Sequence, residues 1–238
     1  MRADASRPWL AVRLGCTDYE EALALQRRIV AAKNAEPSMP DVLLRLEHPP
    51  VFTLGRRGGA ENIVAADRTL DGLEVPVVQV ERGGNITYHG PGQLVVYPIV
   101  DLRRAGLSVV SFVEGMEWAM IETAARWGIS AETNSRNRGA WVGDDKLGSI
   151  GITVRRGVSF HGLALNVNTD LRPFSWIHPC GLQGVGVTSM AAILGRFLDM
   201  EAVGAALERN LEAAFRTILE KSSFAALIRH LPPEEPVR

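Results

Sequence analysis

The sequence has little cysteine and no long apolar run, and both absences narrow the class of protein. Two cysteines, Cys16 and Cys180, occur in 238 residues, so a disulfide framework is not expected. No apolar run approaches the roughly 18 to 20 residues that span a bilayer, and residues 1–8 lack the apolar segment of a secretory signal. We therefore expect a cytoplasmic protein without a membrane partner. In a reducing compartment, a cysteine in an unusual setting is more often reactive than structural.

A marked excess of charge of either sign is also absent. The 26 Lys and Arg residues against 27 Asp and Glu residues give a formal net charge of −1. The strongly basic face that nucleic-acid or anionic-membrane binding requires is therefore not indicated. Neither a Cys-x-x-Cys nor a His-x-x-x-His spacing occurs, so no metal site is expected.

The apolar pattern predicts an α+β fold with antiparallel pairs and three long helices. Thr17 to Glu20 has the capping-box pattern that begins a helix, and Pro37 ends that helix. Further helices are expected over residues 108–127 and 200–220. Strands are expected over residues 9–14, 41–47, 51–54, 75–81, 94–102, 140–142, 146–154 and 158–167, the last three as an antiparallel meander. We expect one domain over residues 9–220, a flexible leader at 1–8 and a loose tail at 221–238.

Residues 82–93 form a glycine-rich connection that packing alone explains poorly. Four glycines and one proline in these 12 residues allow close approach to a ligand and positive φ angles. Polar residues stand among them: Arg82, Thr87, Tyr88, His89 and Gln93. A binding loop and a long tight turn both fit this composition. A phosphate loop does not, because no Gly-Lys-Ser/Thr ending follows.

Lys146 enters a predicted strand that also contains Gly148 and Gly151. A lysine in this position is typical of an exposed sheet edge. Glycines inside a strand give up side-chain packing, and the close approach of a ligand or of another backbone is one reason for them.

Cys180 lies between Pro179 and Gly181, which places it on an irregular loop and favours exposure over burial in an apolar stripe. Cys16, directly after Gly15, is the cysteine we expect to be inert. A thiol with an unperturbed pKa near about 8.5 is only slightly ionised at neutral pH, and a neighbouring cation would raise that fraction. The candidates are Lys146, His89, His161 and His178, and the pattern does not choose among them.

Several long segments together resemble the lipoyl(octanoyl) transferase family of protein-lipoylation enzymes. The segments read EHPPVFTLG at 47–55, RGGNITYHGPGQ at 82–93, KLGSIG at 146–151, HGLALN at 161–166 and DLRPFSWIHPCG at 170–181. The resemblance covers residues 10–219 in order, and it leaves the leader and the proline-rich tail outside.

The resemblance implies a mixed, largely antiparallel sheet flanked by helices, like the catalytic domain of biotin and lipoate protein ligases. It implies Cys180 as the acyl-thioester nucleophile and Lys146 as the residue that lowers its pKa and moves protons. The implied substrate contacts are Arg82, Gly83, Gly84, Asn85, Ile86, Thr87, Tyr88, His89, Ser149, Ile150, Gly151, Gly162, Leu163 and Ala164.

The family's donor is an octanoyl group on acyl carrier protein. Its acceptor is a lysine in the lipoyl domains of 2-oxoacid dehydrogenase complexes or in the glycine-cleavage carrier protein. Exchanging a thioester for an amide is downhill, so we expect no ATP, cofactor or metal. We also expect a monomer. Gly83, Gly84, Gly151 and Gly162 are expected to leave a channel for the acyl chain.

Three other functions fit parts of the sequence. An ATP-dependent lipoate or biotin protein ligase would share the fold, but it needs no nucleophilic cysteine. A thiol hydrolase would use Cys180 with His89 or His161 and lose the acyl group to water. A non-catalytic module that binds acyl carriers would not depend on Cys180 at all.

Overall fold

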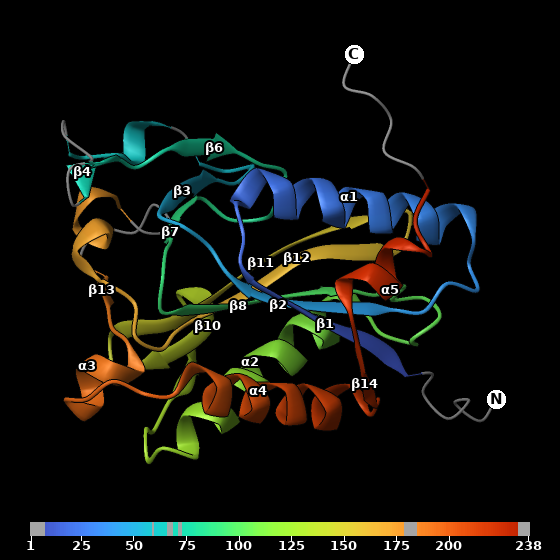
Figure 1. Cartoon of the computed structure of the whole chain (residues 1–238). Coiled ribbons are helices and arrows are strands. Elements are labelled where there is room, and N and C mark those ends of the chain that lie inside the picture. The colour runs from blue at the N-terminus through green and yellow to red at the C-terminus, as the bar shows by residue number, and fades with distance from the viewer. Residues whose placement is uncertain (1–7, 59, 66–68, 71–72, 179–184, 233–238) are drawn as a thin grey trace.

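The computed structural model describes residues 8–58, 60–65, 69–70, 73–178 and 185–232, and it has a large twisted sheet between helices (Figure 1). The strand order of the main sheet is β14-β1-β2-β8-β12-β11-β10-β9, with β13 beside β11. Its strands are β1 (Trp9–Cys16), β2 (Val42–Glu47), β8 (Gln93–Ile99), β9 (Glu132–Asn134), β10 (Asn137–Val142), β11 (Asp145–Arg155), β12 (Val158–Asn166), β13 (Gly186–Val187) and β14 (Leu219–Ser222). β1 runs parallel to β2 and β14, whereas the pairs from β2 through β8, β12, β11 and β10 to β9 are antiparallel. The expected α+β fold with a mixed, largely antiparallel sheet is confirmed.

Helices cover both faces of this sheet. In Figure 1, α1 (Tyr19–Ala35) lies on one face, while α2 (Val109–Ala125) and α4 (Met200–Phe215) lie on the other. Because side chains alternate along a strand, Leu44 of β2 joins the core under α1 and Leu43 joins the core under α2 and α4. None of the helices in the described ranges is both long and apolar enough to cross a bilayer.

A smaller sheet in the order β6-β3-β7 contains part of the glycine-rich segment. Its strands are β3 (Val51–Leu54), β6 (Val77–Gln79) and β7 (Ile86–His89), and further short elements are β4 (Thr69–Leu70), β5 (Leu73–Glu74), η1 (Ala60–Asn62) and η2 (Arg172–Trp176). The strand expected over 75–81 is therefore shorter, and the connection that follows it contains a strand of its own. β7 forms because Ile86 to His89 pair with Leu54 to Val51.

The first helix begins one residue later than the capping-box pattern predicts. Asp18 is the N-cap, and its Oδ1 accepts hydrogen bonds from the backbone N–H of Glu20 at 2.8 Å and of Glu21 at 3.3 Å. The Thr17 hydroxyl instead donates to the Leu14 carbonyl at 3.2 Å. Aspartate caps a helix as well as threonine does, so the sequence pattern left two neighbouring candidates.

The C-terminal segment differs from the expected loose tail that begins at residue 221. β14 continues to Ser222, and α5 (Phe224–Ile228) follows, capped by the Ser223 hydroxyl. Leu227 is fully buried in the core under α1. Leu227, with the partly buried Ile228 and Leu231, thus anchors this segment on the core.

Candidate functional site

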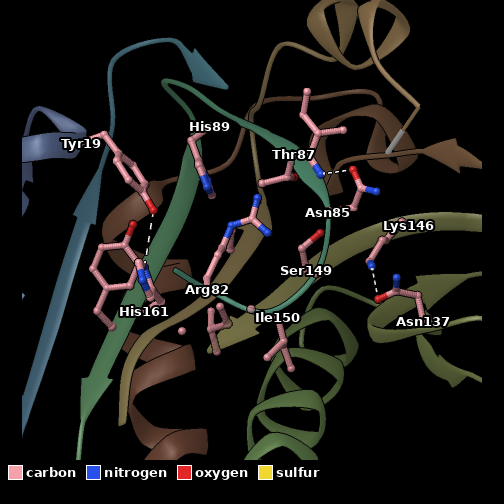
Figure 2. A pocket seen from close by; sticks show the side chains of 17 residues that line it. Tyr19, Arg82, Asn85, Thr87, His89, Asn137, Lys146, Ser149, Ile150 and His161 are labelled. Carbon is pink, nitrogen blue, oxygen red and sulfur yellow. Dashed lines mark hydrogen bonds between the residues drawn. The ribbon is translucent and has the colours of Figure 1, made fainter. Parts of the chain in front are cut away.

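A pocket runs along β11 and β12, and its floor consists of Lys146 and residues 149–151 of β11 and residues 161–164 of β12 (Figure 2). The paired residues Ser149 and Ala164, Ile150 and Leu163, and Gly151 and Gly162 line it. Lys146 lies at one end of the floor, and His161, opposite Ile152, lies at the other. Ile152 lies six residue steps along the strand from Lys146, which corresponds to roughly 20 Å. The floor is therefore long enough for an extended apolar chain.

The segment that contains β7 forms the opposite wall of the pocket. The Gly83 N–H donates to the Ile152 carbonyl at 3.0 Å, which ties this wall to the floor. A Cβ on Gly151 would lie 3.0 Å from the Gly83 oxygen and 3.0 Å from Arg82 Cδ, and one on Gly162 would lie 2.1 Å from the Val96 oxygen. Neighbouring chain thus occupies the space that these two glycines leave. The close approach of another backbone explains why these two positions are glycine, and both also line the pocket.

Arg82 holds the wall to β3 as well as lining the pocket. Its side chain is buried, and its guanidinium donates to the Thr53 carbonyl at 2.7 Å and to the Thr53 hydroxyl at 2.8 Å. A further bond reaches the Gly83 carbonyl at 3.0 Å. Planar guanidinium groups suit such multiple acceptors, so this arginine organises the loop around it.

Lys146 is only 3% exposed, although its position in the sequence is typical of a sheet edge. β11 lies between β12 and β10, and β13 pairs with its first residues. The Lys146 Nζ donates to Asn137 Oδ1 at 3.1 Å and lies 5.2 Å from the centre of the Trp141 ring. An amide oxygen and an aromatic face both stabilise an ammonium group without neutralising it.

Irregular pairing of β10 with its two neighbouring strands accompanies the contact between Asn137 and Lys146. The register with β11 shifts between Ala140 and Trp141, and the Trp141 Nε1–H donates to the Asn137 carbonyl at 3.1 Å. The buried carboxylate of Glu117 on α2 accepts from the Gly139 N–H at 2.8 Å and from Arg138 at 2.9 Å. These bonds hold the irregular strand in the shape that the lysine contact requires.

A buried polar cluster of Tyr19, His48, His89, Tyr97 and His161 occupies the other end of the pocket and the interior behind it. Burial lowers the pKa of His48 to about 4 and that of His161 to about 3, and it lowers the pKa of His89 well below its usual value. Burial also raises the pKa of Tyr19 to about 12. These groups are therefore neutral at pH 7. No three His, Cys, Asp or Glu side chains of the described ranges are grouped so as to hold a metal ion.

His89 links the glycine-rich segment to the strand that carries Lys146. Its Nδ1–H donates to Gln93 Oε1 at 2.7 Å, and the Gln93 amide donates to Asn166 Oδ1 at 2.9 Å. Asn166 donates to the Thr188 carbonyl at 3.0 Å, and the Thr188 N–H donates to the Lys146 carbonyl at 3.0 Å. The segments singled out in the sequence thus belong to one hydrogen-bond network.

Most of the predicted site residues come together at this pocket. Those that line it are Lys146, Arg82, Gly84, Asn85, Ile86, Thr87, His89, Ser149, Ile150, Gly151, Gly162, Leu163 and Ala164. Gly83 and Tyr88 do not line it. The Gly83 N–H is bonded to the Ile152 carbonyl, where the wall meets the floor. The buried Tyr88 ring packs against Phe52 and Phe174, because β7 side chains alternate between two sides.

Cys180 lies outside the described residues, and so do its neighbours at 179 and 181–184. The described chain resumes near Lys146, where β13 pairs Gly186 with Asp145 and Val187 with Lys146. On the preceding side, the His178 N–H donates to the Asn62 carbonyl at 2.8 Å, and Asn62 donates to Asn85 of the pocket wall at 3.0 Å.

Four lining residues were not among the predicted substrate contacts: Tyr19, Tyr97, Asn137 and His161. His161 stood in a recognised segment, but only as a candidate cation near Cys180. Tyr19 begins α1 and Tyr97 lies within β8, where both fit ordinary core positions. Asn137 carries no sequence signal, because its contact with Lys146 accompanies irregular pairing of β10 with β9 and β11.

Known proteins are similar to this chain in sequence and in fold. An octanoyltransferase from Desulfotalea psychrophila is 49% identical over 79% of this chain and 85% of its own length. A crystal structure of lipoate-protein ligase A bound with ATP superposes with a TM-score of 0.72 at 16% identity, covering 93% of each chain. Biotin protein ligase from Aquifex aeolicus has a TM-score of 0.51 at 10% identity, covering 90% of this chain and 70% of its own. These two likenesses confirm the expected resemblance in fold.

The family assignment follows from the extent of the sequence match. Residues 18–212 match the family described as the lipoyl protein ligase A/B catalytic domain. This range includes both strands of the pocket floor, the glycine-rich wall and Lys146. The chain therefore belongs to the lipoyl protein ligase A/B catalytic domain family.

Proposed function

We propose that this chain is an octanoyltransferase that receives an octanoyl group on Cys180 and passes it to a lysine amine of a partner protein. The observation that carries the proposal is the buried Lys146 side chain at one end of a pocket whose floor includes the small residues Gly151, Gly162 and Ala164. An apolar floor suits an acyl chain, and a lysine at its end suits proton transfer at a thioester. The octanoyltransferase relative supports the same activity.

The pairing of Cys180 with Lys146 is supported by the described residues on either side of the cysteine. Cys180 follows His178 by two residues, so their Cα atoms are at most about 7 Å apart. His178 is joined through Asn62 to Asn85, a residue of the pocket wall. On the other side of Cys180, the described chain resumes at β13, which pairs with Asp145 and Lys146. The described residues on both sides of the cysteine are thus connected to the pocket.

The proposed reaction proceeds in two acyl transfers. The Lys146 ammonium favours the Cys180 thiolate, which attacks the donor thioester carbonyl, and the carbonyl–sulfur bond of the donor then breaks. The carrier leaves as a thiol with a proton from Lys146. The neutral Lys146 amine next accepts a proton from the acceptor lysine as that amine attacks acyl-Cys180 and releases the thiolate. Backbone N–H groups of the glycine-rich segments are suited to stabilise the oxyanion at each step.

We propose octanoyl-acyl carrier protein as the donor. As acceptors we propose lipoyl domains of 2-oxoacid dehydrogenase complexes and the glycine-cleavage carrier protein. The low cysteine content supports a reducing compartment, and we propose the cytoplasm. A monomeric state stays a prediction that light scattering would test.

Intact mass spectrometry after incubation with octanoyl-acyl carrier protein tests the proposal. We expect a single octanoyl adduct on Cys180 that is lost when a lipoyl domain is added. The Cys180→Ser variant should lose both the adduct and turnover, whereas Cys16→Ser should keep both. An adduct that persists in Cys180→Ser, or none in the unaltered protein, would contradict the proposed intermediate.

The same preparation distinguishes the transferase from an ATP-dependent ligase with this fold. A ligase would exchange pyrophosphate into ATP in the presence of Mg²⁺ and free octanoate. We expect no such exchange above the rate without octanoate, and a strong octanoate-dependent exchange would favour the ligase instead.

A further inference from the structure

His161 has a backbone conformation that strands rarely contain. Its φ angle is +58°, although it is not a glycine and lies inside β12. Such left-handed conformations cost roughly 1 to 3 kcal/mol and persist only where the surroundings stabilise them. The Gln26 side chain on α1 supplies one such contact, since its Oε1 accepts from the His161 N–H at 2.7 Å.

The positive φ angle changes the side of the sheet on which the imidazole lies. Phe160 and Ala164 belong to the core under α1, whereas Leu163 and Leu165 belong to the opposite core. Simple alternation would place His161 with Leu163. Instead its ring stacks on Phe160 with centroids 4.8 Å apart, and its Nδ1 lies 3.5 Å from the Tyr19 hydroxyl on α1 (Figure 2). The unusual backbone thus directs the imidazole towards the end of the pocket.

The second ring nitrogen of His161 is buried without a hydrogen-bond partner among the described residues, and the residue itself lines the pocket. The residue is only 1% exposed. A buried polar atom that lacks a partner costs about 1 to 3 kcal/mol. An unusual φ angle and an unsatisfied nitrogen therefore coincide at one residue, and this residue lines the pocket.

We propose that His161 Nε2 recognises a hydrogen-bonding oxygen near the far end of the bound acyl chain. This inference rests on the proposed function, because it assumes that the chain lies along the floor from Lys146 towards His161. A neutral imidazole whose Nδ1 accepts from the Tyr19 hydroxyl carries its proton on Nε2. The ligand class is thus an acyl chain with a hydroxyl or carbonyl oxygen at its last carbons.

The test compares octanoyl- and 8-hydroxyoctanoyl-acyl carrier protein as donors. The measured quantity is the ratio of kcat/KM for the hydroxylated donor to kcat/KM for the plain donor. In His161→Phe, which keeps an aromatic ring but removes both nitrogens, we expect this ratio to fall about tenfold, the value of one hydrogen bond. An unchanged ratio would overturn the inference.

Two further variants separate recognition from general damage. Ile150→Val alters the middle of the floor and should affect both donors alike, so that the ratio stays the same. Tyr19→Phe removes the hydroxyl that orients the imidazole and should lower the ratio about threefold; it also serves if His161→Phe does not fold. If the unaltered protein transfers neither acyl group, the proposed function fails, which differs from an unchanged ratio with active protein.

Discussion

The two ends of the pocket floor surround their titratable side chains with different kinds of contact. At one end, the Lys146 Nζ is held by an amide oxygen and an aromatic ring. At the other, burial lowers the pKa of His161 to about 3 and raises the pKa of Tyr19 to about 12, so both groups stay neutral. The Lys146 end, where contacts favour a charged group, is the end at which we propose proton transfer. The His161 end is suited to position a chain by neutral contacts alone.

Removal of the charge at the Lys146 end should have the largest effect. Lys146→Met keeps an unbranched side chain of similar length but has no amine. If Lys146 is the proposed base, kcat for octanoyl transfer should fall about 10³-fold, as for the loss of a general acid–base group. Steady-state assays with a lipoyl domain measure the effect, and Lys221→Met, at an exposed position of β14, is the control. A variant with more than a tenth of the original turnover would remove the distinction between the two ends.

A larger side chain at Gly162, in the middle of the floor, should lower the free energy of unfolding. A Cβ at Gly162 would lie 2.1 Å from the Val96 oxygen and 2.7 Å from Pro98 Cδ, so Gly162→Ala should cost about 3 kcal/mol of unfolding free energy. Gly143→Ala is the matched control, because nothing lies within 4 Å of its Cβ and only its φ of +57° opposes the change. We expect about 1 kcal/mol there. Equal losses in urea unfolding would show that the strands separate easily.

A carboxylate in place of the Asn137 amide would test whether the contact between Asn137 and Lys146 affects proton transfer. Asn137→Asp preserves shape but pairs the amine with a negative charge, which should favour the protonated form of Lys146. The rising limb of the pH–rate profile should move upward by about one pH unit, with roughly tenfold lower turnover at neutral pH. Asn134→Asp adds the same charge on the neighbouring strand β9 and should shift the profile much less. A loss of turnover without a pH shift would indicate a purely structural role for Asn137.

The neutral imidazoles predict a dependence of stability on pH. The pKa values of His48 and His161 in the folded chain are about 4 and about 3, against an ordinary value of 6.5. Below that value the unfolded chain binds protons that the folded chain does not bind. The unfolding free energy should therefore be fully present above about pH 6.5 and decrease as the pH falls towards 4. Each imidazole contributes up to about 1.4 kcal/mol per pH unit within this window.

Urea unfolding between pH 7 and pH 4.5 measures that slope. His161→Phe should reduce the slope by about one proton, since it removes one of the three buried imidazoles with a lowered pKa. His230→Gln, which removes an exposed imidazole, should leave the slope unchanged. If His161→Phe has the slope of the unaltered protein, the His161 end is more hydrated than its burial indicates.

Local patterns in the sequence predicted much of the fold. The meander from 137 to 166 follows from alternating apolar residues and glycine turns, and the long helices follow from their apolar stripes. The loop prediction for 82–93 missed β7, because its ladder depends on β3 more than 30 residues earlier. Lys146 does not have the exposed edge position that is typical of such a lysine, because β10 and β13 both pair with β11 at this residue.

The sequence by itself determined the segments from which this site is built, because motifs of adjacent residues identify them without reference to distance. Only the tertiary structure decided which side chains of those segments meet. Irregular pairing of β10 accompanies the contact of Asn137 with Lys146, and a positive φ angle turns His161 towards Tyr19. Both depend on register and on backbone angles that distant contacts impose. No periodicity along the chain records them, and for this reason the contrast between the two ends of the pocket emerged only from the folded structure.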